Sequence, residues 1–171
     1  INEEVLEYTA QAIKDAARFK DLKLPADTER MLHLLRVSSS LVSPVDPKER
    51  TELAEIAAKL EGLYGKGKYC GADGKAKCRD LGELTEVMAK SRKYDELLDA
   101  WAGWHTISRE MRPLYQRFVE LANKGARSVG FSDSGSMWRS AYDMTPDAFE
   151  RETDRLWQQV RPLYEDLHCK V

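Results

Sequence analysis

The sequence predicts an all-α fold, with a single helical region over residues 1–171. Three observations predict this fold: apolar residues recur every three or four positions, no segment alternates apolar and polar residues as a strand does, and proline-marked caps precede helical patterns. A chain of 171 residues is long enough for one hydrophobic core and too short for two full domains.

Two helices are expected before the first strong cap signal. Residues 2–20 carry an apolar stripe separated by charged residues, which is typical of an amphipathic helix. A second stripe follows Pro25, from Met31 to Leu41, and Pro44 should end it because proline cannot continue a helix.

Two further helices begin with the same signal, a capping side chain followed by proline. Asp46 and Pro47 predict a helix that runs to about Lys68. Thr145 and Pro146 predict a last helix that runs to the end of the chain.

The longest helical pattern lies between these two, over residues 94–128. Pro113 should kink or divide it, because proline removes one backbone donor and crowds the preceding turn. A short helix is expected from Leu84, and a short aromatic one over residues 131–142.

The aromatic residues of this second half are expected to form core rather than a ligand site. We expect the helix that carries Trp101 and Trp104 to be central, with Trp138 packed near it. The aromatic set is Trp101, Trp104, Tyr115, Phe118, Phe131, Trp138 and Tyr142.

A glycine-rich segment, residues 65–82, is predicted to be a surface loop with its ends held together. Cys70 and Cys78 are eight residues apart, a spacing that a disulfide spans easily. A zinc site would need two more ligands nearby, and neither cysteine has one. A disulfide formed in an oxidising compartment is therefore the favoured interpretation, with Cys169 left over.

Several classes of function are excluded or unsupported. With 27 Lys and Arg against 29 Asp and Glu, the chain cannot bind nucleic acid by bulk charge. No apolar run is long enough to span a membrane. No compact catalytic motif, whether His-Glu-x-x-His, Gly-x-Ser-x-Gly or a phosphate-binding loop, is present.

The three histidines do not predict a metal site. His33, His105 and His168 are far apart in the sequence, whereas a metal needs converging ligands. Glu165 and His168 have the Glu-x-x-His spacing of di-iron bundles, but that site needs a second copy and two more carboxylates. We expect hydrogen-bonded structural histidines instead.

A series of motifs from Tyr69 to His168 carries more information than periodicity. These motifs are Tyr69-Cys70, Cys78, Met88-Ala-Lys-Ser-Arg-Lys-Tyr94, Ala100-Trp-Ala-Gly-Trp104, Phe118-Val-Glu-Leu121, Gly135-x-x-Trp-Arg-Ser-x-Tyr142 and Pro162-Leu-Tyr-x-x-Leu-His168. In order and spacing the series resembles the peptidyl-dipeptidase A family, that is, angiotensin-converting enzyme and its relatives. The resemblance extends more loosely to the residues before Tyr69.

The resemblance implies a large, nearly all-helical ellipsoid divided by a deep cleft, with zinc at its floor. Such an enzyme is a secreted or periplasmic zinc metallopeptidase that cleaves oligopeptides and also binds chloride. Its zinc ligands lie in a His-Glu-x-x-His helix and on a downstream glutamate, which this sequence lacks. We therefore expect an N-terminal, non-catalytic wall of the enzyme that binds no zinc by itself and joins the remainder of the peptidase chain.

Family roles carry over to few positions. His105 matches an arginine or histidine of a buried chloride site, and Tyr142 matches a tyrosine that helps to bind a second chloride. Glu83 is a weak candidate for the substrate cleft, because the family's Leu-acid-Pro motif is one residue shorter here. Cys169 and Lys170 replace a small residue and an aromatic one.

Two hypotheses follow. The first is the helical part of a peptidyl-dipeptidase, and the absence of an Asn-x-Ser/Thr acceptor indicates a bacterial or otherwise unglycosylated relative. The alternative is a stand-alone helical binding module without catalytic activity. A stand-alone module should bury its apolar helix faces, which distinguishes the two.

Overall fold

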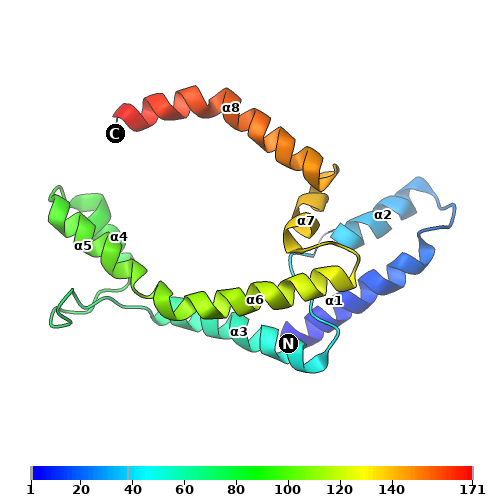
Figure 1. Ribbon diagram of the computed structural model, residues 1–171, viewed down its shortest axis with the longest axis horizontal. Coiled ribbons are helices and arrows are strands. Elements are labelled where there is room, and N and C mark those ends of the chain that lie inside the picture. Colours follow the sequence, from blue (N-terminus) through cyan, green and yellow to red (C-terminus); the bar gives the residue numbers. More distant parts are fainter. Residues whose placement is uncertain (1, 38, 171) are drawn as a thin grey trace. The chain divides into compact units, whose positions relative to one another are not determined.

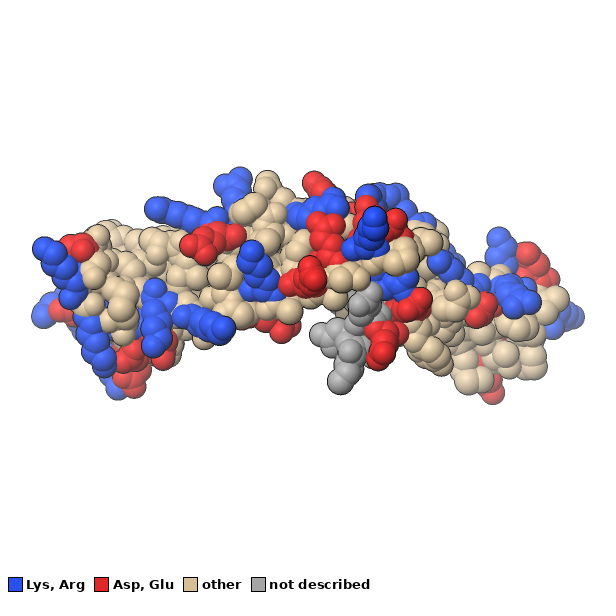
Figure 2. All heavy atoms as spheres, turned by 90° about the horizontal axis from the view of Figure 1, so that it is seen from below, with Lys and Arg blue, Asp and Glu red and all other residues tan. Residues whose placement is uncertain are grey.

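The computed structural model describes residues 2–37 and 39–170, so Ile1, Ser38 and Val171 lie outside the description. The described residues are mostly helical and form no strand, which confirms the all-α class (Figure 1). They divide into two compact units, Ile1–Glu49 with Leu121–Val171 and Arg50–Glu120. On the face shown in Figure 2, acidic and basic side chains are interspersed.

The first unit is built from helices at both ends of the chain. Its elements are α1 (Asn2–Ala16), the 3-10 turn η1 (Ala17–Phe19), α2 (Ala26–Val37), the end of α6 (Ser108–Ser128), α7 (Ser134–Arg139), the 3-10 turn η2 (Ser140–Tyr142) and α8 (Pro146–Lys170). Its core contains Ala10, Ile13, Val42, Ala126 and Met137. Val129 and Phe131 pack against this core.

The second unit is organised along α3 (Pro47–Lys66) and α6, which both continue into the first unit. The guanidinium of Arg117 on α6 donates from Nε and Nη2 to the two carboxylate oxygens of Glu52 on α3, each at 2.8 Å. Leu53, Ile56 and Met111 are buried in this unit. A two-pronged ion pair thus links the two helices.

Both predicted cap-plus-proline starts are confirmed. The Asp46 carboxylate accepts hydrogen bonds from the backbone N–H groups of Lys48, at 2.8 Å, and Glu49, at 3.1 Å. The Thr145 hydroxyl oxygen accepts from the N–H of Ala148 at 3.2 Å. These side chains satisfy backbone donors that have no partner inside the helix.

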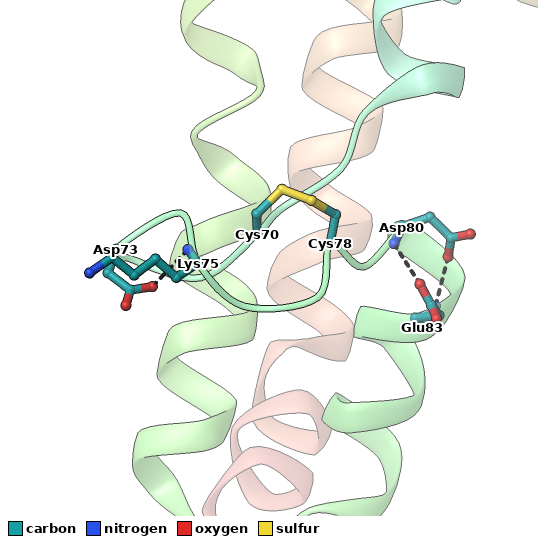
Figure 3. The surroundings of a disulfide bond; sticks show 6 residues. All are labelled: Cys70, Asp73, Lys75, Cys78, Asp80 and Glu83. Atoms are coloured by element: carbon teal, nitrogen blue, oxygen red, sulfur yellow. Dashed lines mark hydrogen bonds between the residues drawn. A yellow bond between two sulfur atoms is a disulfide. The ribbon is translucent and has the colours of Figure 1, made fainter.

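The glycine-rich loop is closed at its base in two ways. Cys70 and Cys78 form the predicted disulfide (Figure 3). Beside it, Tyr69 and Arg79 exchange two backbone hydrogen bonds, of 2.9 and 2.8 Å. This closed loop leads into α4 (Leu81–Lys90), which forms a hairpin with α5 (Tyr94–His105).

Tyr69 and Arg79 also attach the base of the loop to α5. Both side chains contact Asp99: the Tyr69 hydroxyl donates at 2.6 Å, and Arg79 Nη2 donates at 3.1 Å. The hydrogen bond to Asp99 is the main reason that the pKa of Tyr69 is raised. A Cβ on Gly103 would lie 2.2 Å from the Tyr69 ring, so only glycine allows the ring to lie there.

Pro113 does not divide the helix, which is one of the two effects predicted for it. The pattern over residues 94–128 divides at Thr106 and Ile107, whereas α6 continues through Pro113. Pro113 and Arg109 are both exposed, so water can hydrate the Arg109 carbonyl that loses its helical donor. At the true division, the Thr106 hydroxyl donates to the carbonyl of Gly103 at 2.8 Å, which satisfies part of the end of α5.

Two other predicted helices have different bounds. The second helix is Ala26–Val37, and Val42 beyond it lies outside any helix, completely buried. The helix expected over residues 131–142 is reduced to Ser134–Arg139 and η2. Asp133 caps it at 2.7 Å through the N–H of Ser136, and this hydrogen bond is the main reason that the pKa of Asp133 is lowered.

The prediction of core packing is wrong for Trp101 and Trp138. Trp101 is 56% exposed and Trp138 is 55% exposed, while Trp104 is half-buried with its ring edge-on to Tyr64. Small residues occupy the buried face of α5, where Ala100 and Gly103 lie. The Trp138 indole N–H instead donates to the carbonyl of Ser40 at 2.6 Å.

Close approach at Gly125 predicts a large effect of adding a single methyl group. A Cβ at this position would lie 1.7 Å from the carbonyl oxygen of Val42, so Gly125→Ala should destabilise the fold by roughly 2–4 kcal/mol in urea unfolding followed by circular dichroism. Gly62→Ala, on α3 with open space around it, is the matched control and should stabilise by about 0.5–1 kcal/mol. Equal effects of the two substitutions would contradict the packing at Gly125.

The disulfide predicts a defined pattern of thiol chemistry. Alkylation of the denatured, unreduced chain should label Cys169 alone, because Cys70 and Cys78 are joined. Replacing both Cys70 and Cys78 by serine should cost about 2 kcal/mol of stability, since the closed loop is short. Cys169→Ser, at an exposed free cysteine, should leave the unfolding midpoint unchanged. Three labelled cysteines would refute the pairing.

Candidate functional site

His105 ends α5 and is held by the preceding helical turn. Its Nδ1 lies 2.6 Å from the carbonyl oxygen of Trp101, and its ring lies 4.2 Å from the Trp101 ring. A carbonyl only accepts hydrogen bonds, so Nδ1 must carry the proton and donate. Nε2 then becomes a donor only when the ring takes up a second proton. His105 can therefore donate to an anion from Nε2 in its charged form.

A cavity of about 590 Å³ adjoins His105 within the second unit. Its wall includes Trp104 and Tyr115, together with Arg109 and Arg112, and contains no acidic residue. Among the described residues, neither arginine forms an ion pair. The cavity therefore combines aromatic surface with positive charge, which suits an anion better than a cation.

Glu83 is engaged at the start of α4. Its backbone N–H donates to Asp80 at 2.9 Å, and its carboxylate accepts from the Asp80 N–H at 3.1 Å, which together form a capping box (Figure 3). Lys77 donates to its other oxygen at 3.2 Å. The backbone hydrogen bond first, and Lys77 second, lower the pKa of Glu83. Binding a substrate through this carboxylate would require breaking the cap.

Tyr142 lies in the first unit, on η2. Its ring stacks on Phe149 at 4.2 Å, and the residue is 58% exposed. The next residue, Asp143, accepts from both terminal nitrogens of Arg30, and its pKa is lowered chiefly by that hydrogen bonding. His105 and Glu83 belong to the second unit, so the structure does not place Tyr142 in one site with them.

The histidines lie on three different helices: His33 on α2, His105 on α5 and His168 on α8. The Glu165 carboxylate accepts from Arg161 at 2.6 Å, and His168 stacks on Tyr164. Over residues 2–37 and 39–170, no group of three or more His, Cys, Asp or Glu is arranged to hold a metal ion. Nor is any helix in the described part of the chain long and apolar enough to cross a membrane.

Two structural clusters near the candidate residues escaped sequence analysis. The capping box has a recognisable signal, an aspartate three residues before a glutamate at Asp80 and Glu83. The contacts of Asp99 with Tyr69 and Arg79 have no comparable signal, because they join residues 20 and 30 positions apart.

Comparison with known proteins gives a consistent result. Residues 1–171 match the family model described as angiotensin-converting enzyme. Angiotensin-converting enzyme of Rattus norvegicus is 40% identical over 125 residues, which cover 72% of this chain and 9% of that protein. The Mus musculus enzyme is 33% identical over 174 residues, covering 100% of this chain and 12% of that protein.

A further relative is the angiotensin-converting enzyme-like protein Ace3 of Mus musculus, 34% identical over 150 residues, which cover 86% of this chain and 20% of that protein. The chain thus spans about a tenth of the length of the first two relatives and a fifth of the third. The match over all 171 residues agrees with the helical fold and with the motifs between Tyr69 and His168. The chain belongs to the angiotensin-converting enzyme family, the peptidyl-dipeptidase A family that its motifs resemble.

Proposed function

We propose that this chain is a helical, non-catalytic part of a zinc-dependent peptidyl-dipeptidase that releases C-terminal dipeptides from oligopeptides. The family match along all 171 residues supports the enzyme class. Zinc peptidase chemistry needs three protein ligands, a bound water and a carboxylate base. The sequence contains no His-Glu-x-x-His motif, so the groups that do the chemistry would come from other parts of the complete protein.

The described residues do not fit a catalytic zinc ion. The histidines lie on separate helices, and Nδ1 of His105 is occupied by the carbonyl of Trp101. Glu83, the carboxylate for which a role in the substrate cleft is expected, is hydrogen-bonded to Asp80 and Lys77. We assign this chain to the wall of the cleft, where it would shape the space for an oligopeptide.

The observation that carries this proposal over a stand-alone module is the apolar surface of α8. This 25-residue helix has no buried residue. Its exposed apolar side chains recur at helical spacing: Leu156, Trp157, Val160, Leu163, Tyr164 and Leu167. A stand-alone protein rarely leaves a continuous apolar stripe of this kind in water, whereas part of a larger helical enzyme would cover it.

We also propose that His105 and Tyr142 contribute to chloride binding in the complete enzyme. The positively charged surroundings of His105 support the first assignment. Among the described residues the Tyr142 hydroxyl has no hydrogen-bond partner, so it can donate to an anion. The disulfide between Cys70 and Cys78 supports an exported, secreted or periplasmic location, because disulfides persist in oxidising compartments.

The proposal predicts that this chain alone releases no dipeptide. Zinc titration calorimetry should show no tight binding, and an assay of dipeptide release from an oligopeptide should stay at background. Adding the portion of the complete protein that carries His-Glu-x-x-His should restore release that a chelator abolishes. Chelator-sensitive release by the purified chain alone would overturn the assignment of the chemistry to other residues.

Chloride binding at His105 should depend on its charge. His105→Arg should broaden the chloride nuclear magnetic resonance line at least as much as the unaltered chain does, because the guanidinium is always charged. His105→Ala should broaden it less. His168→Ala, which removes a histidine from the first unit, is the control and should change nothing. Equal broadening by His105→Arg and His105→Ala would exclude His105 from chloride binding.

A further inference from the structure

A second cavity, also of about 590 Å³, lies in the first unit among α1, η1, α2 and the residues that follow α6. Its wall is largely apolar and includes Ile13, Ala17, Phe19, Leu22, Leu32 and Val129. Of these residues, Ile13 belongs to the core of the unit and Val129 packs against that core, whereas Phe19 and Leu22 are about half exposed. A cavity of this size lies within the usual range for small-molecule sites.

The ionisable groups around this cavity are mostly basic. Lys14, Lys20, His33 and Arg36 line it, against Glu29 alone among the acidic residues. Lys14 is half-buried, and within residues 2–37 and 39–170 neither lysine forms an ion pair. Two unpaired ammonium groups beside an apolar wall favour a ligand with a negative charge.

The remaining basic groups are already engaged. The Arg36 guanidinium lies over the Phe131 ring, 5.1 Å from its centroid, and His33 Nε2 lies 3.7 Å from the Asp143 carboxylate. Lys14 and Lys20 are therefore the groups that are available to meet an anion.

We propose that this cavity binds a long-chain carboxylate, with its hydrocarbon tail along the apolar wall and its carboxylate at Lys14 and Lys20. Each buried methylene of such a tail adds favourable transfer free energy, while the charged head keeps its contact with the lysines and with water. The proposal is independent of peptidase activity, because His105, Tyr142 and Glu83 do not line this cavity.

A competition titration on the full chain tests this ligand. Dansyl-labelled undecanoate, kept below its micelle concentration, should bind with a stoichiometry of one per chain. Dodecanoate should displace it, whereas hexanoate should be at least about a hundredfold weaker, because its tail buries fewer methylenes. Dodecanol, which has the tail without the charge, should be about tenfold weaker than dodecanoate.

Matched variants locate the site. Lys14→Gln with Lys20→Gln should weaken dodecanoate binding about tenfold, whereas Lys23→Gln, three residues after Lys20 but outside the cavity wall, should not. Ala17→Trp should fill the cavity and abolish binding. Gln11→Trp, exposed on α1 outside the wall, should leave binding intact. Circular dichroism checks that each variant is folded. If Ala17→Trp does not fold, the comparison of dodecanoate with hexanoate and dodecanol on the unaltered chain decides the question.

Several results would overturn the proposal. These are an absence of saturable binding, equal affinities for dodecanoate and dodecanol, and unchanged binding in Ala17→Trp. A further test is cosedimentation with vesicles of phosphatidylcholine and phosphatidylglycerol. If Ala17→Trp cosediments to the same extent as the unaltered chain, the proposal is overturned, since lipid would then contact the exposed Phe19 and Leu22 rather than enter the cavity.

Discussion

The first unit depends on one close contact, between the backbone of Val42 and Gly125 on α6. No other residue type fits at position 125, because a Cβ would overlap the Val42 carbonyl. Val42 is fully buried and belongs to the same core cluster as Ala126 and Met137. Beside it, Lys124 forms an ion pair with Glu49. Segments from opposite ends of the sequence are thereby joined around a residue with no side chain.

The second unit uses polar contacts in a comparable way. The Asp99 carboxylate accepts hydrogen bonds from Tyr69 and Arg79, which flank the disulfide loop on its two sides. Gly103 leaves space for the Tyr69 ring. The disulfide closes the loop, and the Asp99 contacts fix that loop to α5. The two functions are separate: one restricts the unfolded chain, and the other positions the folded loop.

The residues that carry the family resemblance are of two kinds, structural positions and candidate ligands. The motifs that resemble the peptidyl-dipeptidase A family include structural positions, among them Tyr69, Cys70 and Gly103, whose contacts explain why these residue types are needed. His105 differs, since it lines a cavity together with Arg109 and Arg112, while only its Nδ1 is hydrogen-bonded, to the carbonyl of Trp101. These surroundings are the basis for proposing His105 as a chloride ligand.

Local signals in the sequence determined the all-α class, the helix starts at Pro47 and Pro146, and the closed loop at Cys70 and Cys78. Each depends on neighbouring residues, through hydrogen bonds within a helical turn or a short ring. Tertiary structure alone decided that Trp101 and Trp138 are exposed and that α6 continues through Pro113. Periodicity identifies an apolar face, but which face is buried depends on close contacts such as Gly103 with Tyr69 and Gly125 with Val42, between residues more than 30 positions apart in the chain.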